Sequence, residues 1–181
     1  DKAADYALKS LDLGEKLNDK KAMAMAYSDL SNLFWKQGKF ESGLEYGLRS
    51  LKLFEAWGIT DLDYDFTLYV VGNNYLALKD YEKARKYYEH SIIIGERYGF
   101  YNNLSDVYIS LVDLYTYLGD FENAMEAGRN AVKYAELLEN NFMIMRSWLA
   151  IGKMQNKRGN CAEAIEGLRK SINVATNDFG D

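Results

Sequence analysis

The chain has 181 residues, 48% hydrophobic and 27% charged, and 27 acidic residues against 22 Lys and Arg give a net charge of -5. This composition is typical of a folded globular protein, and its negative charge argues against general binding to nucleic acid. One cysteine and one histidine are too few for a disulfide framework or a Cys/His zinc site. Proline is absent, no apolar run approaches the ~18 residues of a membrane span, and no signal-like segment opens the chain. We therefore expect long helices, no membrane insertion and a cytoplasmic protein.

Apolar residues recur at helical spacing along the whole chain. Tyr108, Leu111 and Tyr115, for instance, are separated by three and four residues, as on one face of an α-helix. A lone helix is predicted at 2–17, followed by helix pairs at 20–57, 62–98, 102–139 and 141–176. The first helices are predicted at 20–37, 62–78, 102–118 and 141–158, and the second helices at 40–57, 81–98, 121–139 and 161–176. No linker rich in Pro, Ser or Gly interrupts the series, so we expect one continuous domain over residues 1–181.

The turn between the two helices of each pair falls at a repeated position. The turn residues, 40 or 41 positions apart, are Gly38, Lys79, Gly119 and Gly159. A glycine here can adopt positive φ and end the first helix. The residues five positions after the turn are small enough for close helix packing, and they are Gly43, Ala84, Ala124 and Ala164. Each pair alone buries too little surface, so we expect the pairs to be stabilised by stacking on their neighbours.

In phased repetition these motifs resemble the tetratricopeptide repeat. The third pair matches the family pattern at Tyr108, Leu111, Tyr115, Gly119, Phe121, Ala124 and Ala131. The closing proline of the family is missing, and the period is near 40 residues. The longer helices resemble the extended variant found in bacterial peptide-sensing regulators and in some signalling scaffolds. The fourth pair departs further, with Gln155 and Cys161 in place of aromatic residues. The resemblance covers essentially the whole chain and implies an all-α fold, a right-handed α-solenoid of stacked antiparallel helix pairs, used for protein recognition.

The resemblance also implies where a partner binds, because the first helices of this family line an inner, concave wall. Carried over to this sequence, the residues expected to bind a peptide are Asn32, Trp35, Lys36, Tyr69, Asn73, Asp113, Tyr117, Arg146, Lys153 and Lys157. The amides of Asn32 and Asn73 can pair with both N–H and C=O groups of an extended peptide. Tyr69 and Tyr117 are expected to face away from the core as amphipathic anchors. The alternative is that these residues form an ordinary solvated polar face.

Three features that invite a catalytic or metal-binding interpretation are explained more simply. The segment 61–65 resembles the start of a calcium-binding loop, but Phe66 and Gly72 stand where that loop needs Gly and Glu, so its aspartates are expected to cap a helix. His90 has no acid or nucleophile arranged against it and is expected at the surface or partly packed. Cys161 occupies an inter-helix position and is expected to be a buried structural thiol. We therefore expect no enzymatic activity, no cofactor and no metal.

Two functions remain open from the sequence. The first is a protein-interaction module that binds a peptide or partner segment in the concave groove, as the sensor or adaptor part of a larger bacterial signalling or regulatory protein. The second is a structural spacer or self-associating solenoid, because the helix at 2–17 lacks a first helix and Ile172 has no following helix to cover it. Uncapped ends of this kind would support a homo-oligomer.

Overall fold

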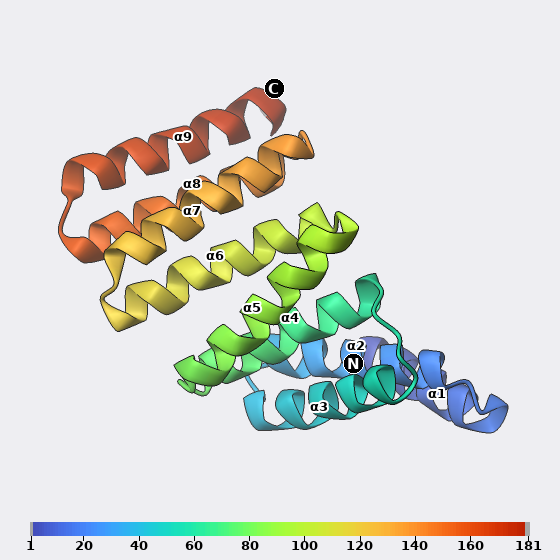
Figure 1. Ribbon diagram of the computed structural model, residues 1–181. Helices are drawn as coiled ribbons and strands as arrows, with labels where there is room; N and C mark the ends of the chain where they lie inside the picture. The colour runs from blue at the N-terminus through green and yellow to red at the C-terminus, as the bar shows by residue number, and fades with distance from the viewer. Residues whose placement is uncertain (1, 180–181) are drawn as a thin grey trace. The chain divides into compact units, whose positions relative to one another are not determined.

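The computed structural model describes residues 2–179, which form α-helices and the turns between them, with no strand in that range (Figure 1). The helices are α1 (Lys2–Leu17), α2 (Lys20–Lys36), α3 (Phe40–Ala56), α4 (Leu62–Ala77), α5 (Tyr81–Tyr98), α6 (Tyr101–Leu118), α7 (Phe121–Leu137), α8 (Asn141–Arg158) and α9 (Cys161–Phe179). Each begins and ends within three residues of the position predicted from the sequence. After α1, the first and second helices alternate as α2–α3, α4–α5, α6–α7 and α8–α9.

The turn residues end the first helices as their repeated position predicts. Gly119 and Gly159 adopt left-handed φ angles of 75° and 90°, and their N–H groups bond back to carbonyls in the last turns of α6 and α8. Lys79 takes the same conformation with a φ of 64°, at a small steric cost that a glycine avoids. Asp120 then caps α7 by accepting the backbone N–H of Asn123 at 3.2 Å, which satisfies one of the unpaired donors of the first turn.

Close packing between helices depends on residues without bulk. A Cβ atom on Gly128 in α7 would lie 2.5 Å from Cγ1 of Ile151 in α8, and one on Gly72 in α4 would lie 2.5 Å from the ring of Tyr88 in α5. Both distances are too short for a real Cβ, so a glycine is needed at each contact. The first contact joins neighbouring pairs and the second joins the helices of one pair, so a glycine allows close approach at both kinds of interface.

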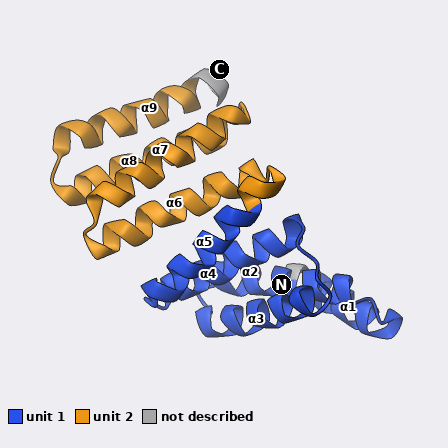
Figure 2. Cartoon of the chain, in the orientation of Figure 1, with its two compact units in different colours: residues 1–94 blue, residues 95–181 orange. Residues whose placement is uncertain are grey.

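The chain divides into two compact units (Figure 2). Unit 1 spans Asp1–Ile94 and unit 2 spans Gly95–Asp181, so the boundary falls inside α5. In unit 1 the core includes Val70 and Val71 of α4, and in unit 2 it includes Val112 and Leu114 of α6, all with 0% exposure. A first helix, α4 in unit 1 and α6 in unit 2, therefore contributes fully buried apolar side chains to each core. One continuous domain over the whole chain stays a prediction.

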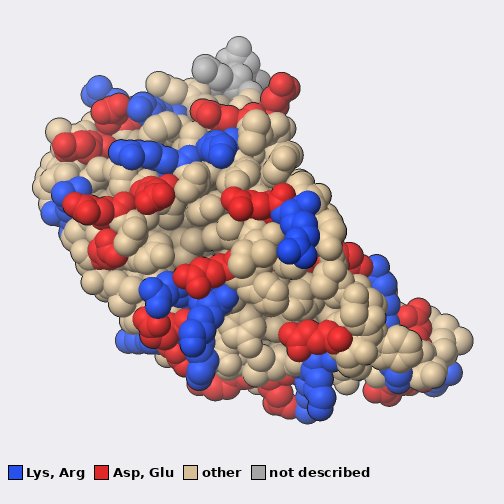
Figure 3. All heavy atoms as spheres, viewed as in Figure 1, with Lys and Arg blue, Asp and Glu red and all other residues tan. Residues whose placement is uncertain are grey.

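Acidic and basic side chains are interspersed on the face of the molecule that Figure 3 shows. Several ion pairs lie one helical turn apart on exposed faces, such as Arg49 with Glu45 at 2.6 Å and Lys170 with Glu166 at 2.8 Å. Pairs of this kind contribute little to stability because water and salt screen them. Ion pairs that join two helices bear more on how the helices are held together, and they lie on the first helices.

Candidate functional site

The residues predicted to bind a partner all lie on first helices. Asn32, Trp35 and Lys36 are on α2, Tyr69 and Asn73 on α4, Asp113 and Tyr117 on α6, and Arg146, Lys153 and Lys157 on α8. The first five belong to unit 1 and the others to unit 2. Within each unit the structure brings some of these side chains together and buries others.

In unit 2, one of the predicted cations is already engaged by the protein. Arg146 in α8 donates through Nη1 to Oδ1 of Asp106, which lies 40 residues earlier in α6. The side chains are only 34% and 27% exposed. Burial raises the pKa of Asp106 above its usual range, and the charge of Arg146 opposes this shift without cancelling it. Arg146 therefore joins α6 to α8 through an ion pair, which favours a structural role for it.

Two turns further along the same helices, the predicted side chains are exposed. Asp113 and Lys153 both face solvent. The protein atoms around Asp113 reduce the hydration of its carboxylate and raise its pKa, while the charge of Lys153 lowers it by a smaller amount. One turn beyond, Nζ of Lys157 lies 5.2 Å from the centre of the Tyr117 ring, a cation–π contact. We call the surface made by Asp113, Tyr117, Lys153 and Lys157 the α6–α8 face, which carries two cations, a carboxylate and a ring that is 59% exposed.

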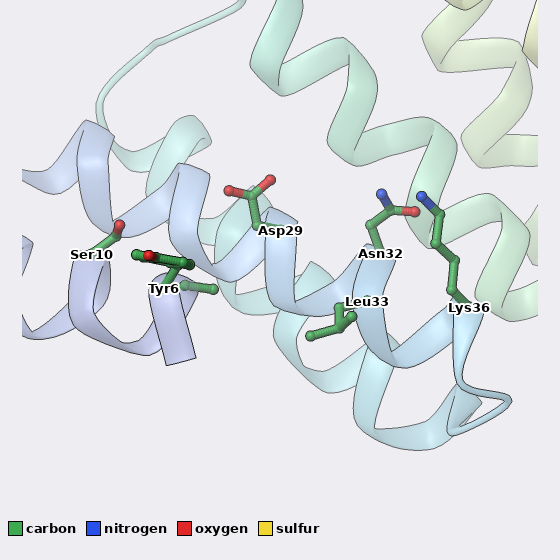
Figure 4. Close-up of a pocket in the computed structure, with 7 residues that line it drawn as sticks. Tyr6, Ser10, Asp29, Asn32, Leu33 and Lys36 are labelled. Atoms are coloured by element: carbon green, nitrogen blue, oxygen red, sulfur yellow. The ribbon is translucent and has the colours of Figure 1, made fainter. Parts of the chain in front are cut away.

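In unit 1, a hollow of about 300 Å³ lies between α1 and α2. Its lining residues are Tyr6, Ala7 and Ser10 of α1 and Asp29, Asn32, Leu33 and Lys36 of α2. Figure 4 shows the polar groups of Asp29, Asn32 and Lys36 projecting from the same side of α2. We call this site the α1–α2 hollow. It contains two predicted residues, Asn32 and Lys36, whereas Trp35 is half-buried on α2 and is not among the lining residues.

Tyr6, Ser10 and Asp29 are lining residues that the sequence reasoning did not single out. A signal for the first two is present in the repeat, because Tyr6 and Ser10 lie 40 residues before Tyr46 and Ser50 in α3. In the structure the hydration of Asp29 is reduced by the atoms around it, which raises its pKa, and repulsion from Asp63 adds to this shift. A carboxylate with a raised pKa gains from a cationic or hydrogen-bonding group brought next to it.

Two predicted residues of unit 1 need a correction. Tyr69 is only 9% exposed, with its ring 6.2 Å from that of Phe66, so it does not face away from the core as expected. Asn73 is 3% exposed, and its Oδ1 accepts the hydroxyl of Tyr88 at 2.7 Å. The physical reason is that α4 is packed on several sides, by α2, α3 and Tyr88 of α5. Neither side chain is presented to a peptide in this structure.

The residues considered for metal binding or catalysis have other surroundings. Oδ1 of Asp61 accepts the backbone N–H groups of Asp63 and Tyr64 at 3.1 and 3.2 Å and so caps α4, as predicted. His90 is exposed and packs edge-on against the ring of Tyr64 at 5.8 Å. Cys161 is exposed, which corrects the expectation of a buried thiol. Among the described residues, no group of three or more His, Cys, Asp or Glu side chains is placed to hold a metal ion.

The repeated helix pairs define an all-α solenoid, a class of repeat protein. The family model of the tetratricopeptide repeat matches residues 64–136, from α4 to α7. Tetratricopeptide repeats are thus present over residues 64–136, and the resemblance read from the sequence is confirmed there. The comparison with curated proteins gave no match. Within residues 2–179, no helix has the length and apolar character needed to cross a lipid bilayer.

Solved structures with this fold cover nearly the whole chain. BtubC (BKLC) from P. vanneervenii has a TM-score of 0.84 at 18% identity, over 98% of this chain and 74% of its own. A putative kinesin light chain with TPR-like repeats from Podosopora anserina has a TM-score of 0.74 at 13% identity, over 97% of this chain and 86% of its own. A Rap protein complexed with competence and sporulation factor has a TM-score of 0.74 at 17% identity, over 96% of this chain but only 58% of its own. At such identities the likeness shows the fold alone.

Proposed function

We propose that this chain is a protein-interaction module that binds a peptide or partner segment on its first helices, as the sensor or adaptor part of a larger bacterial signalling or regulatory protein. The observation that carries the proposal is the α6–α8 face. There the ammonium of Lys157 lies over the ring of Tyr117, and Asp113 and Lys153 are exposed on the same two helices. An exposed aromatic ring flanked by charges is the kind of anchor on which protein interfaces depend.

The charges of this face indicate what kind of partner it fits. Lys153 and Lys157 are one helical turn apart, so a single acidic side chain or terminal carboxylate can contact both ammonium groups. Such a group would also compete with Asp113 for the ammonium of Lys153. The pKa of Asp113 is raised by reduced hydration, so its ionised form is poorly stabilised at this place. An apolar side chain next to the acidic group would cover the Tyr117 ring. We therefore propose a partner segment with an acidic group beside an apolar residue.

The structural neighbours support a peptide or protein as the partner. One of them is a Rap protein complexed with competence and sporulation factor. This chain spans 58% of that protein's length, so the similarity does not indicate that it shares an activity of the whole protein. What the two share is the fold, and stacked helix pairs present an extended surface suited to holding another chain.

The test is a selection from a random peptide library on the immobilised chain, followed by affinity measurements on the selected peptides. Charge reversal with Lys153→Glu and Lys157→Glu together should weaken binding at least about tenfold, since close charge pairs in an interface are worth one or more kcal/mol. The matched control is Arg129→Glu with Arg169→Glu, which changes the net charge equally at exposed positions of α7 and α9. Peptides that bind both double variants equally would show that the α6–α8 face is not the site.

A second candidate function, self-association, is favoured by one observation on α9. Ile165 and Ile172 are 53% and 59% exposed, and their spacing of seven residues places them on one side of the helix. Burying them against a second copy would remove apolar surface from water. Light scattering over a range of concentrations tests this, with Ile172→Asp as the disrupting variant. A monomer at every concentration rules out self-association.

A further inference from the structure

Another pocket of unit 1 is lined by α4 and α5 and has a volume of about 410 Å³. Its lining residues are Tyr75 of α4 and Lys83, Lys86, Tyr87 and His90 of α5, all in unit 1. We call it the α4–α5 pocket. None of these five residues carries a carboxylate, although the chain as a whole is acidic. A pocket of this volume, with aromatic rings and a few polar groups, has the composition of a small-ligand site.

Two stacked tyrosines form the aromatic part of the α4–α5 pocket. The rings of Tyr75 and Tyr87 have centroids 5.4 Å apart and an interplanar angle of 17°. Tyr75 is only 9% exposed and Tyr87 is half-buried, so packing holds both rings in place. Burial first, and then Tyr75 and Glu55, raise the pKa of Tyr87. Its hydroxyl is therefore protonated at neutral pH and can donate a hydrogen bond to an anion.

Three side chains that can carry positive charge line the pocket from α5. Lys83, Lys86 and His90 are three and four residues apart, so each lies one helical turn from the next. Nζ of Lys83 lies 5.1 Å from the centre of the Tyr75 ring and 2.8 Å from the carboxylate of Asp80. Lys86 and His90 are exposed. An anion at Lys86 would therefore be within one turn of both other groups.

The lysine at the middle of this row distinguishes α5 from the other second helices. At the position of Lys86 they carry an exposed acidic residue in every case, namely Asp5, Glu45, Glu126 and Glu166. An exposed charge at such a position contributes little to stability, so the fold does not require a lysine there. The reversed charge falls where it lines a pocket, which favours a role in binding an anion.

From this arrangement we propose that the α4–α5 pocket binds an aryl phosphate, a phosphate monoester joined directly to an aromatic ring. This goes beyond the proposed function, because the pocket shares no residue with the α6–α8 face. A phosphate monoester has a charge of about −1.5 to −2 at pH 7 and several acceptor oxygens, which suits Lys83, Lys86 and His90. In the pocket a cation lies next to a ring, as Lys83 does to Tyr75. The adjoining phosphate and ring of the ligand can therefore contact the ammonium groups and Tyr87 together.

The test uses phenyl phosphate as the probe, with His90 as the reporter. Because the chain has one histidine, its imidazole C–H signals in a proton NMR spectrum belong to His90. Titration of the full chain with phenyl phosphate at pH 7 should shift these signals along a saturating curve that gives the dissociation constant. Inorganic phosphate lacks the ring and benzoate lacks the second charge, so each should bind at least several-fold more weakly.

The same aryl phosphate can be a free small molecule or a phosphotyrosine side chain of a partner protein. Acetyl-phosphotyrosine amide, which carries a backbone around the same group, distinguishes these sources. It should bind as tightly as phenyl phosphate if the pocket accepts a side chain of a protein, and more weakly if the pocket accepts only the free molecule. Either result, with phenyl phosphate bound, supports the proposal.

Lys86→Glu introduces the residue that three other second helices have at this position, so the variant should fold, which circular dichroism checks. It should weaken binding of phenyl phosphate at least about tenfold, because attraction becomes repulsion. Arg129→Glu is the matched control, with the same change of net charge at an exposed position of α7, and should leave the affinity unchanged. Tyr87→Ala, which copies Ala127 of the third pair, should bring the affinities for phenyl phosphate and inorganic phosphate close together, because the ring contact is lost.

Three results would overturn the proposal. They are no saturable shift of the His90 signals, equal affinity for phenyl phosphate in Lys86→Glu and the wild type, and binding of benzoate or inorganic phosphate as tight as that of phenyl phosphate. The chain with Lys153→Glu and Lys157→Glu should still bind phenyl phosphate, and Lys86→Glu should still bind the library peptides. The proposal for the α4–α5 pocket and the proposal for the α6–α8 face can therefore fail independently.

Discussion

The hydroxyl of Tyr88 in α5 donates a 2.7 Å hydrogen bond to the side-chain oxygen of Asn73 in α4, and both residues are buried. The bond joins the first and second helices of one pair inside unit 1. Asn73 is thus held by the protein at a repeat position where the sequence predicted a peptide-binding amide.

The first prediction concerns this bond. Tyr88→Phe should lower the free energy of unfolding by about 1–3 kcal/mol, because the buried oxygen of Asn73 loses this donor without access to water. The measurement is urea unfolding followed by circular dichroism. The control is Tyr117→Phe at an exposed ring, where we expect no change. Wild-type stability in Tyr88→Phe would show that the bond contributes nothing.

The fold was predictable because its signals are local and repeated. Helical spacing and the turn residues predicted every helix, and Lys79, at the repeated turn position, has a left-handed φ of 64° like the glycines of the other turns. Each of these depends on a few neighbouring residues, and four copies of the pattern confirm one another. The site depends instead on which side chain of another helix reaches each position.

Asn73 and Asp113 show this difference. They occupy the same position of their repeats, six before the turn, yet Asn73 is buried and Asp113 is exposed. Nine residues after the turn the second helices carry Tyr88 in one repeat and Gly128 in the other. Tyr88 is long enough to cover and bond Asn73, whereas Gly128 has no side chain to do so for Asp113. Part of the difference in exposure therefore comes from a residue 15 positions away in the sequence.

The prediction that Cys161 is buried was wrong for a related reason. Its repeat position holds aromatic residues in the other pairs, among them Phe40 and Phe121, which are half-buried. A large ring placed at the start of a second helix can reach the neighbouring helix, but a thiol is too short to do so. Cys161 is consequently exposed, although the column as a whole predicts burial.

The second prediction compares two glycines with different constraints. In Gly72→Ala the new Cβ would lie 2.5 Å from the ring of Tyr88, which is 0% exposed and hydrogen-bonded, so it has little room to move. Overpacking of this kind should cost about 1–3 kcal/mol or more. In Gly119→Ala nothing lies within 4 Å of the Cβ, and the cost comes only from the φ of 75°.

The left-handed φ at position 119 costs about 1–2 kcal/mol of unfolding free energy for alanine and less for asparagine, which adopts left-handed φ more readily. Urea unfolding of Gly72→Ala, Gly119→Ala and Gly119→Asn checks both mechanisms. Gly119→Asn should be more stable than Gly119→Ala, whereas Gly72→Ser should be no better than Gly72→Ala. The reverse order at either site would contradict the stated mechanism.

The third prediction is a loss of stability at high pH. Burial, and then a 2.9 Å hydrogen bond to the carboxylate of Glu96, raise the pKa of Tyr134 to about 12. The folded pKa is above the unfolded value near 10, so this contribution is fully present below about pH 10 and is lost as the pH rises towards 12. Tyr134→Phe should therefore flatten the fall in unfolding free energy between pH 10 and 12.

Urea midpoints at pH 8, 10 and 11 measure this fall, and the absorbance of tyrosinate locates the ionisation directly. Tyr117→Phe serves as the comparison, because that ring is 59% exposed. Tyr64, whose pKa burial and Glu55 also raise to about 12, should add a similar fall of its own. If Tyr134→Phe loses stability as steeply as the wild type, the phenol is not responsible.

The fourth prediction concerns the carboxylate of the α6–α8 face. Reduced hydration raises the pKa of Asp113, and Lys153 partly lowers it. Lys153→Ala should therefore raise the pKa of Asp113 further, as seen by NMR titration of the carboxyl carbon, whereas Lys157→Ala should change it less, because Lys157 lies over Tyr117. The folded pKa of Asp113 lies above its unfolded value, so its contribution to stability is present below the unfolded pKa and is lost as the pH rises through the folded one. At pH 7 the ionised group is thus unfavourable in the folded chain, and Asp113→Asn should raise the urea midpoint there but not below pH 3.

A lower midpoint for Asp113→Asn at pH 7 would mean that Lys153 and Asp113 form a stabilising pair, in which case Lys153 would be less available to an acidic partner.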